Sequence, residues 1–435
     1  MSQAAGAWDV LVVGGGPAGI AAAVCAREAG ARVALIDEGL GPGGQIWRPS
    51  PRVVPPRLAR RWLRRLDASG VTVMCSTAVV DLWPGPSRGA VVVAEAHDRG
   101  FQIAARAVVL ATGARERFLP FPGWTLPNVF GVGAAQALIK GGLSVRGRRV
   151  IVAGTGPLVL PVAASLARAG ADLQLVAEQA PPSRVARFAL GLWRTPSLLA
   201  QAAAYRAQFM RTAYSMGTWV VAARGDSEVH SVTVTDGNDT REVGCDILCA
   251  AFGLVPNTEL ARLAGCSMCG DGVMVDACQA TTVPDIYCAG EPTGVGGLDL
   301  AIIEGEIAGR VAAGRAVEAT MAAHAVRQRQ RTARLDEAFG LRTEVSRLAT
   351  PDTIVCRCED VRLKDLNPKW TPRQAKLYTR VGMGTCQGRI CAPALQSVMS
   401  WPGTHDTVRA PTQPARVSTL GGTTRATQSF ERGAR

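Results

Sequence analysis

The chain is 435 residues long and carries 48 Lys and Arg against 35 Asp and Glu, a formal net charge of +13. At ~150 residues per domain, this length predicts about three domains. No stretch approaches the ~20 apolar residues that span a bilayer, and no charged-then-apolar leader begins the chain, so the 12 cysteines predict a reducing cytoplasm. Scattered basic charge favours a solvated surface over a nucleic-acid-binding patch. We expect no nucleic-acid partner and no transmembrane segment, and leave open a peripheral association with the inner face of the cell membrane.

Residues 9–19 predict the first unit of a Rossmann-type fold, because a buried strand enters a glycine-rich turn and an alanine-rich helix follows. Gly14 permits the tight turn, Gly16 lets the backbone approach a pyrophosphate at the helix N-terminus, and Gly19 permits close packing of helix on strand. A single motif of this kind is weak evidence for a dinucleotide and needs a supporting residue.

A second predicted strand, residues 31–36, ends directly before two carboxylates. Asp37 lies eighteen residues after Gly19, where a carboxylate is expected to bind the ribose hydroxyls of a dinucleotide. Glu38 is the competing candidate for the same role.

Three further segments resemble the flavoproteins with two dinucleotide-binding domains, such as thioredoxin reductase, and occur in the same order. Residues 43–46 resemble the loop beside the flavin ring, and residues 111–113 resemble the strand end that returns the chain from the FAD domain. Residues 282–291 resemble the second FAD motif, in which Glu291 replaces the usual aspartate beside the ribityl chain, and residues 296–309 resemble the loop and helix that follow. The resemblance implies FAD and disfavours an α/β sheet with ordinary glycine turns. The candidate FAD-binding residues are Gly14, Gly16, Pro17, Ala18, Gly19, Asp37, Glu38, Gly44, Gln45, Ala111, Thr112, Gly113, Gly290, Glu291 and Ala301.

The strand, turn and helix pattern recurs at residues 149–159, so a second nucleotide-binding-like domain is expected between the two FAD segments. Its candidate nucleotide-binding residues are Gly154, Gly156 and Glu178. Val159 stands at the position of the third glycine, and Glu178 comes one position late for a ribose carboxylate. The fingerprint is therefore incomplete, and NAD(P), ATP and an empty site are the alternatives.

Residues 181–216 depart from a compact nucleotide-binding domain, because they are apolar and arginine-rich at helical spacing. They predict an inserted pair of helices, which serves either core packing or docking of another subunit. The four histidines of the chain lie outside recognised motifs, and no site for oxidising an organic substrate is evident. The catalytic residues are therefore unassigned.

Four cysteines form two close pairs, Cys356-x-Cys358 and Cys386-x4-Cys391, with twenty-seven residues between the pairs. Four thiolates are the ligand set of a [2Fe-2S] cluster, and structural zinc uses the same set. Zinc sites usually draw on pairs spaced by two to four residues, so Cys-x-Cys favours iron and sulfur over zinc or unligated thiols. Residues 353–395 resemble the small helical [2Fe-2S] domain of bacterioferritin-associated ferredoxin, which implies that these four cysteines ligate the cluster.

Residues 9–395 as a whole resemble the FAD and [2Fe-2S] alpha subunit of bacterial dye-linked amino-acid dehydrogenases, the group that includes opine oxidase, hydrogen cyanide synthase, and proline and hydroxyproline dehydrogenase. The resemblance implies a flavoprotein beta subunit like D-amino-acid oxidase as partner, and often a small [2Fe-2S] gamma subunit. The chain is predicted to pass electrons from that partner, which oxidises an opine, hydroxyproline, proline or glycine, to an acceptor. The alternatives are a self-sufficient NAD(P)H-dependent ferredoxin-type reductase, and an assembly protein with a zinc site.

The expected fold is α/β, with two Rossmann-like dinucleotide-binding domains, of which the FAD domain is discontinuous, and a small helical [2Fe-2S] domain. The expected boundaries are 1–122 for the first part of the FAD domain, 123–254 for the second dinucleotide-binding-like domain with its helical insertion at about 181–216, 255–321 for the second part of the FAD domain, 322–350 for a helical linker, 351–400 for the [2Fe-2S] domain and 401–435 for a tail. The tail is expected to be extended or disordered unless a partner orders it.

Overall fold

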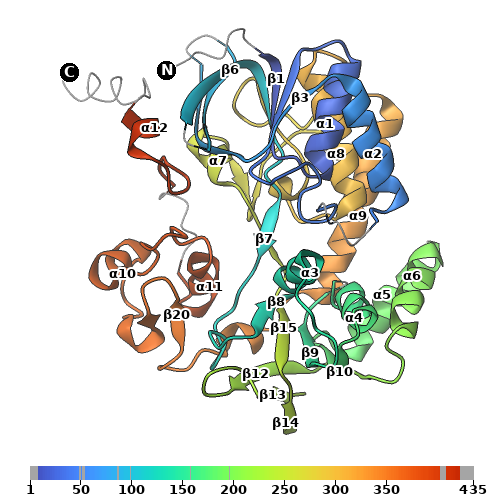
Figure 1. Cartoon of the computed structure of the whole chain (residues 1–435), viewed down its shortest axis with the longest axis vertical. Helices are drawn as coiled ribbons and strands as arrows, with labels where there is room; N and C mark the ends of the chain where they lie inside the picture. The colour runs from blue at the N-terminus through green and yellow to red at the C-terminus, as the bar shows by residue number, and fades with distance from the viewer. Residues whose placement is uncertain are drawn as a thin grey trace. The chain divides into compact units, whose positions relative to one another are not determined.

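The computed structural model describes residues 8–48, 50, 54–85, 88–97, 99–156, 158–194, 196–401 and 408–421. The chain divides into two compact units, whose elements are labelled in Figure 1. The first unit takes in residues 1–115, 255–332 and 406–435, and the second takes in residues 116–254 and 333–405. Each unit therefore draws on segments that are far apart in the sequence.

The first unit is built on a sheet with strand order β3-β2-β1-β6-β5-β4, and β19 pairs with β6. Strands β3, β2, β1, β6 and β19 pair in parallel, whereas β6, β5 and β4 pair antiparallel. The elements of this unit and of its borders are β1 (Trp8–Val13), α1 (Pro17–Glu28), β2 (Val33–Ile36), α2 (Arg57–Ser69), β3 (Thr72–Met74), β4 (Thr77–Pro84), β5 (Ala90–Ala96), β6 (Arg99–Leu110), β7 (Ala114–Glu116), β16 (Leu254–Pro256), α7 (Glu259–Leu263), β17 (Met268–Cys269), β18 (Gly272–Val273), β19 (Ile286–Cys288), η2 (Glu291–Thr293), α8 (Leu298–Ala312), α9 (Ala319–Phe339) and α12 (Val417–Gly421).

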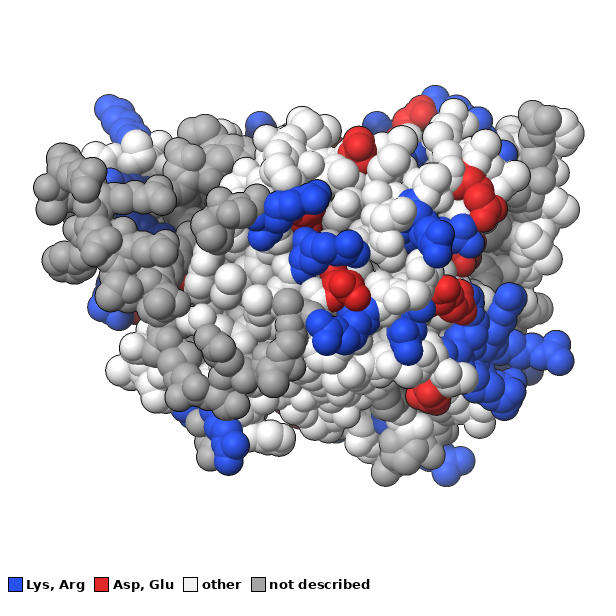
Figure 2. All heavy atoms as spheres, turned by 90° about the horizontal axis from the view of Figure 1, so that it is seen from above, with Lys and Arg blue, Asp and Glu red and all other residues white. Residues whose placement is uncertain are grey.

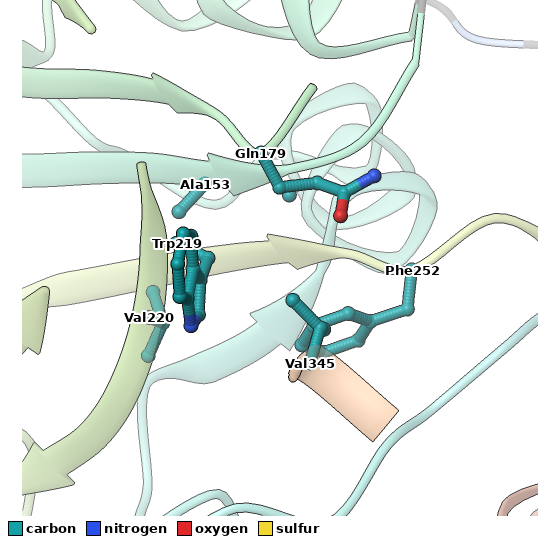
Figure 3. Close-up of a pocket in the computed structure, with 7 residues that line it drawn as sticks. Ala153, Gln179, Trp219, Val220, Phe252 and Val345 are labelled. Carbon is teal, nitrogen blue, oxygen red and sulfur yellow. The ribbon is translucent and has the colours of Figure 1, made fainter. Parts of the chain in front are cut away.

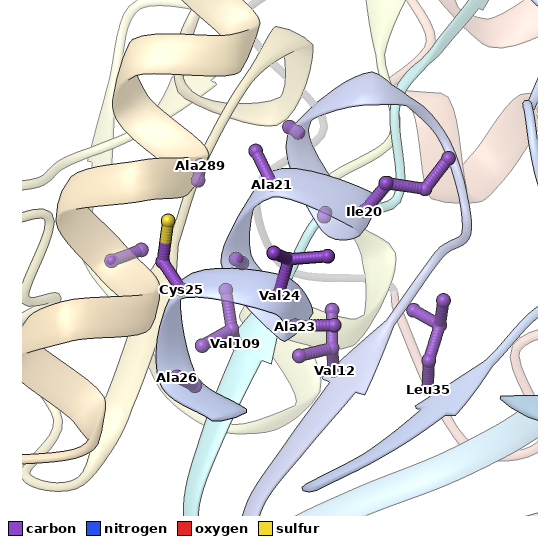
Figure 4. Close-up of a cluster of buried hydrophobic side chains, with 14 of the residues drawn as sticks. Val12, Ile20, Ala21, Ala23, Val24, Cys25, Ala26, Leu35, Val109 and Ala289 are labelled. Atoms are coloured by element: carbon purple, nitrogen blue, oxygen red, sulfur yellow. The ribbon is translucent and has the colours of Figure 1, made fainter. Parts of the chain in front are cut away.

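Alternation along β1 explains the two layers that cover this sheet. Val10 and Val12 lie in the core shared with α1 and α8, whereas Leu11 and Val13 lie in the core on the opposite face, with β4, β5 and α7. Figure 4 shows the first of these cores, in which α1 presents mainly alanine and valine side chains. The predicted strand is thus buried on both faces, as expected for a parallel sheet covered by helices.

Helices α1 and α8 pack closely because α8 has glycines where the two helices meet. A Cβ atom on Gly305 would lie 2.1 Å from the carbonyl oxygen of Ala18, and one on Gly309 would lie 2.1 Å from that of Ala22. The four-residue spacing places both glycines on one face of α8. This contact holds the segment after residue 290 against the first glycine turn.

The second unit contains a five-stranded parallel sheet, β11-β10-β9-β15-β8, and a three-stranded antiparallel sheet, β12-β13-β14. Its elements are β8 (Val129–Gly131), α3 (Val132–Gly141), β9 (Arg149–Gly154), α4 (Val159–Arg168), β10 (Asp172–Glu178), α5 (Pro182–Gly191), η1 (Leu192–Arg194), α6 (Pro196–Ala207), β11 (Ala213–Met216), β12 (Trp219–Arg224), β13 (Ser231–Thr235), β14 (Thr240–Gly244), β15 (Ile247–Ala251), η3 (Val345–Arg347), β20 (Ile354–Cys356), β21 (Val361–Arg362), η4 (Leu363–Asp365), α10 (Pro372–Thr379) and α11 (Cys391–Val398). Val159 begins α4 and is fully buried in the core that this helix shares with β9.

Residues 351–401 form a small C-terminal lobe within the second unit. Its own core contains Val355, Cys356, Val361, Leu366, Ala375, Val381, Cys391, Leu395 and Trp401. The lobe packs on the middle fold, because the indole N–H of Trp124 donates to the carbonyl oxygen of Ile354 over 2.6 Å and because Ala394 joins the core under the five-stranded sheet.

The helical insertion ends earlier than the expected residue 216, which corrects the prediction. Helices α5 and α6 and the short η1 account for its helices, whereas Ala213–Met216 form the edge strand β11 and pair in parallel with Leu175–Glu178 of β10. Local periodicity does not reveal this strand, because its partner lies about 38 residues earlier in the chain.

In the C-terminal tail, residues 408–416 have no helix or strand, whereas residues 417–421 form a short helix in place of the expected extended or disordered segment. Thr412 donates its N–H to the carbonyl oxygen of Val80 over 2.9 Å, and Arg416 donates its N–H to Glu95 over 3.0 Å. Helix α12 follows, and its Thr419 is 2% exposed. The partners that order the tail belong to β4 and β5 of the first unit, so composition alone did not predict them. Residues 402–407 and 422–435 of the predicted tail lie outside the described residues.

The surface of the described residues mixes both signs of charge. Figure 2 shows Lys and Arg side chains over one face, with Asp and Glu among them. The exposed arginines are most closely spaced on α2, at Arg57, Arg60, Arg61 and Arg64. Among the described helices, none has the length and apolar content needed to cross a membrane.

Candidate functional site

The turn between β1 and α1 needs glycine at two positions and leaves space at a third. A Cβ atom on Gly14 would lie 2.2 Å from the carbonyl oxygen of Ala111, and one on Gly19 would lie 1.8 Å from that of Gly14. A Cβ atom on Gly16 would meet no described atom within 4 Å. Pro17 is the first residue of α1, and no described side chain caps this helix. The N-terminus of α1 is therefore uncapped and has open space beside Gly16.

The loop at residues 43–45 lies against this turn. Gly43 donates its N–H to the carbonyl oxygen of Gly15 over 2.7 Å, and a Cβ atom on Gly44 would lie 2.9 Å from the Cα of Gly16. Gln45 is exposed, and its Oε1 accepts from Arg48. The structure thus brings Gly44 to the glycine turn and leaves Gln45 at the surface.

The two carboxylates after β2 have different environments. Asp37 accepts the N–H of Gly15 on Oδ2 and the N–H of Gly39 on Oδ1, so both of its oxygens are used inside the fold. Glu38 is exposed and has no hydrogen-bond or ion-pair partner among the described residues. Asp37 therefore holds the glycine turn, and Glu38 is the freer carboxylate for ribose hydroxyls.

The segment after β19 meets the glycine turn through three predicted site residues. A Cβ atom on Gly290 would lie 2.8 Å from the Cβ of Ala18 and 3.6 Å from that of Ala301. All three residues are buried. The two predicted FAD segments, which are more than two hundred residues apart, are therefore adjacent in the first unit.

Glu291 has one carboxylate oxygen that the fold does not use. Its Oε1 accepts the N–H of Gly297 over 3.0 Å, whereas Oε2 is buried without a hydrogen-bond partner among the described residues. Burial raises the pKa of Glu291 to about 7. An unpartnered buried carboxylate oxygen indicates a missing hydrogen-bond donor, such as a ligand hydroxyl.

Glu304 on α8 supports this segment, although no sequence motif pointed to it. Its Oε2 accepts the N–H of Gly290 and the hydroxyl of Thr293, both over 2.9 Å. Its Oε1 accepts from the guanidinium of Arg329 on α9 at 3.0 and 3.1 Å. Burial raises the pKa of Glu304, although Arg329 opposes this shift. The available signal was an acidic residue directly after the apolar pair Ile302 and Ile303 of a predicted helix.

The strand end at residues 111–113 is tied to the chain that returns from the second unit. Thr112 donates its hydroxyl to the carbonyl oxygen of Asn257 over 2.6 Å, and the Asn257 amide donates back to the carbonyl oxygen of Thr112 over 2.9 Å. Arg115 bridges Asn257 and Glu259. Gly113 adopts a left-handed φ of +70°, and a Cβ atom there would meet no described atom within 4 Å.

These features together fit a dinucleotide bound at the first turn. The uncapped N-terminus of α1 beside Gly16 is suited to a pyrophosphate. Glu38 and the unused Oε2 of Glu291 offer acceptors for ribose and ribityl hydroxyls. The residues present thus match the chemistry expected for FAD.

At the second glycine turn, between β9 and α4, the carboxylate of Glu178 is buried and bound by the backbone. Glu178 accepts the N–H of Gly156 over 3.0 Å and the N–H of Ala180 over 2.9 Å. It is 1% exposed, and burial raises its pKa to about 7. A carboxylate used in this way is not free to bind a ribose.

The chain itself covers the second turn. Thr155 donates its hydroxyl to the carbonyl oxygen of Phe339 over 2.6 Å. Gln179 donates to the carbonyl oxygen of Gly340 over 3.0 Å and accepts the N–H of Arg342 over 2.9 Å. The residues after α9 thus lie along the turn, where an open Rossmann-like fold receives a ligand. We call residues 339–345 the closing segment.

The cavity left beneath the closing segment is small. It is lined by Ala153, Gly154, Gln179, Trp219, Val220, Phe252 and Val345 (Figure 3). Its free volume is about 10 Å³, roughly the space of one water molecule. The guanidinium of Arg342 stacks over Trp219, 4.5 Å from the ring centre. Apolar side chains and an arginine fill the space beside this turn.

The four cysteines of the C-terminal lobe lie in two contacting pairs. The Cys391 thiol interacts with the Cys356 sulfur, lowers the pKa of Cys356 and has its own pKa raised. Cys358 likewise contacts Cys386: a backbone hydrogen bond from Cys386 lowers the pKa of Cys358, but burial and the Cys386 thiol together raise it above its ordinary value. Their thiols are the donor type that iron and sulfur prefer. Among the described residues, no three His, Cys, Asp or Glu side chains lie close enough together to hold a metal ion.

Comparison with known proteins agrees with the fold and the first site. A family model described as pyridine nucleotide-disulphide oxidoreductase matches residues 8–323. The A subunit of opine oxidase from Agrobacterium tumefaciens is 31% identical over 95% of this chain and 91% of its own. Hydrogen cyanide synthase subunit HcnB from Pseudomonas aeruginosa is 32% identical over 88% of this chain and 90% of its own. The crystal structure of L-proline dehydrogenase from P. horikoshii covers 95% of this chain and 79% of its own at 20% identity, with a TM-score of 0.68, which shows a shared fold.

Proposed function

We propose that this chain, which belongs to the pyridine nucleotide-disulphide oxidoreductase family and is a FAD-dependent oxidoreductase, is the electron-transfer subunit of a heteromeric amino- or imino-acid dehydrogenase. The observation that carries the proposal is the contrast between the two glycine turns. The first turn is open at Gly16, and the second is covered by the closing segment at Thr155. A flavoprotein reduced by nicotinamide needs a nucleotide site in its second fold, whereas one that receives electrons from a protein partner does not.

The residues that would hold FAD are those around the open turn. The N–H groups at the start of α1 would bind the pyrophosphate beside Gly16, Glu38 would bind the ribose, and Glu291 would bind the ribityl chain. When bound, FAD accepts electrons in pairs and releases them singly. The chain contributes an open, uncapped helix N-terminus and a fixed segment at Gly290, which Glu304 holds by hydrogen bonding.

The cysteine pairs are proposed to ligate a [2Fe-2S] cluster. Their thiols supply four soft donors within a lobe that has its own core. A [2Fe-2S] cluster carries single electrons, which suits transfer from a flavin to an acceptor. Zinc and unligated thiols are the competing occupants, and metal content distinguishes them.

Similarity to named subunits supports a multi-subunit complex. The A subunit of opine oxidase and the HcnB subunit of hydrogen cyanide synthase align over most of their length with this chain. We propose a partner flavoprotein like D-amino-acid oxidase that oxidises an opine, hydroxyproline, proline or glycine, and a third component in the form of a small [2Fe-2S] subunit. ATP or NAD(P) at the second fold is not part of the proposal, because the closing segment lies along that turn.

Anaerobic titration of the purified holoprotein with NADH tests the proposal, followed by the same titration with the co-expressed partner and an amine substrate. We expect the visible flavin absorption to persist with NADH and to bleach only with partner and amine. Prompt, stoichiometric bleaching by NADH alone would instead identify a self-sufficient reductase.

Iron and acid-labile sulfide content tests the cluster separately. Anaerobically purified protein is expected to contain both, and Cys358→Ser and Cys386→Ser are each expected to lose both with FAD retained. Cys269→Ser is the matched control, because Cys269 is exposed in the first unit and is a free cysteine. Zinc without sulfide in the wild-type protein would refute the cluster.

A further inference from the structure

The helical insertion, defined here as Pro182–Ala207, exposes apolar side chains at the turn between its helices. No described side chain of α5 or α6 is fully buried. Leu190 is 75% exposed and Trp193 is 73% exposed, and both lie where α5 ends and η1 begins. Figure 1 places α5 and α6 beside α4 in the second unit. Large apolar side chains with this exposure indicate a surface that contacts something else.

The charge of this segment has one sign. Residues 182–207 contain four arginines and no Asp or Glu. Arg187 pairs with Glu337 of α9 over 2.9 Å, whereas Arg184 is exposed and forms no ion pair with a described residue. The exposed apolar turn is therefore accompanied by positive charge that the insertion itself does not neutralise.

The insertion is held firmly at its base. The ring of Phe188 packs edge-on against Phe339 with 5.4 Å between ring centres, and the ion pair of Arg187 lies on the same helix. Helix α6 contacts α4. The turn that carries Leu190 and Trp193 is thus presented by packed helices.

We propose that the turn between α5 and α6 docks on an anionic lipid surface. Trp and Leu side chains partition into the interfacial region of a bilayer, and arginine guanidinium groups bind lipid phosphates through charge-assisted hydrogen bonds. Two mostly exposed side chains at a turn are few for a stable protein interface, which buries about 800 Å² on each partner. A few inserted apolar groups with surrounding arginines suffice for reversible membrane association.

Membrane docking at this turn is independent of the proposed electron-transfer role. The docking is peripheral, because no described helix spans a bilayer. Binding of this kind combines apolar insertion with electrostatic attraction, so it weakens as salt screens the charges.

Vesicle flotation of the full-length holoprotein tests the proposal. Vesicles of phosphatidylcholine alone are compared with vesicles that also contain phosphatidylglycerol, at low and high salt. We expect binding to the anionic vesicles only, with loss at high salt. The double variant Leu190→Ser and Trp193→Ser is expected to bind at least about tenfold more weakly, because it removes two inserted apolar side chains.

Met210→Ser is the matched control variant. Met210 is 69% exposed but follows the far end of α6, roughly 18 Å of helix away from Trp193. It is expected to bind as the wild type does, and circular dichroism and FAD content are expected to match in all variants. Equal flotation of the double variant and the wild type would overturn the proposal, as would an absence of binding to anionic vesicles. Loss of a co-purified partner subunit in the double variant, without vesicle binding by the wild type, would assign the turn to a protein interface instead.

Discussion

Thr155 and Phe339 are 184 residues apart in the sequence, yet the Thr155 hydroxyl donates to the Phe339 carbonyl oxygen over 2.6 Å. Gly156 follows Thr155, and a Cβ atom on it would lie 3.9 Å from the Cβ of Phe339. At the equivalent turn of the first unit, Gly16 faces open space. Two turns of the same type therefore have opposite accessibility, because a distant segment of the chain covers one of them.

Gln179→Ala is expected to lower the free energy of unfolding by about 1–3 kcal/mol, because it leaves the partly buried N–H of Arg342 and the carbonyl oxygen of Gly340 without their partner. Urea unfolding measures the loss, and faster proteolysis within residues 339–345 locates it. Gln208→Ala, at an exposed position, is the control and is expected to change stability by less than about 0.5 kcal/mol. Equal effects of both substitutions would contradict the role of the closing segment.

Glu291→Gln is expected to flatten the pH dependence of apo-protein stability. Burial raises the pKa of Glu291 from 4.5 to about 7, so the folded state binds the proton more tightly than the unfolded state. Its contribution to stability is complete below pH 4.5 and is lost as pH rises through about 7, a change of roughly 3 kcal/mol at most. Unfolding of FAD-free protein on both sides of this window measures the change. Glu178 titrates in the same range, so the difference between variant and wild type isolates Glu291, and parallel profiles would refute the assignment.

We expect Asp37→Asn to lower mainly the stability of the fold and Glu38→Gln to lower mainly the affinity for FAD. Asp37→Asn weakens the hydrogen bonds from Gly15 and Gly39 and should cost about 1–3 kcal/mol of unfolding free energy. Glu38→Gln should leave stability within about 0.5 kcal/mol and weaken FAD binding about tenfold. Fluorescence titration of the apo-protein with FAD measures the affinity. The reverse pattern would assign the ribose to Asp37.

Gly305→Ala is expected to destabilise the protein by about 1–3 kcal/mol, because the new methyl group would enter the α1–α8 contact, 2.1 Å from the carbonyl oxygen of Ala18. The distortion should also lower FAD retention, since the same contact holds the two FAD segments together. Gly141→Ala in α3 is the matched helical control. Its Cβ would meet no described atom within 4 Å, so it should stabilise by up to about 1 kcal/mol. Thermal unfolding with both variants checks the contrast.

Several features were accessible from the sequence because they depend on local backbone geometry. The glycine turn at Gly14 and Gly19 follows from contacts within a strand, a turn and a helix, and the structure has the steric contacts that such a turn implies. The similarity to opine oxidase and hydrogen cyanide synthase confirmed the family. The roles of the individual site residues stay predictions, among them ligation by Cys356 and Cys358.

Other features required the folded chain because their partners are distant in sequence. Glu304 and Arg329 support Gly290 from two different helices, and the tail around Thr412 is ordered by β4. The edge strand β11 follows a helical pattern and forms only through pairing with β10. Local propensity is weak relative to such tertiary hydrogen bonds, so composition and periodicity did not predict them.

By itself, the sequence determined the order of the motifs and the glycine turn, because glycine sterics and helix termini act within a few residues of each other. The family and FAD followed from the similarity of those motifs to known flavoproteins. Only the tertiary structure decided which of two similar turns is open and which acidic residue after β2 is free. Those properties depend on Phe339 covering Thr155 and on backbone N–H groups occupying Asp37. Whether a turn is open, and whether a carboxylate still has a free oxygen, depends on the residues packed against it. The chain brings those residues together only when it folds.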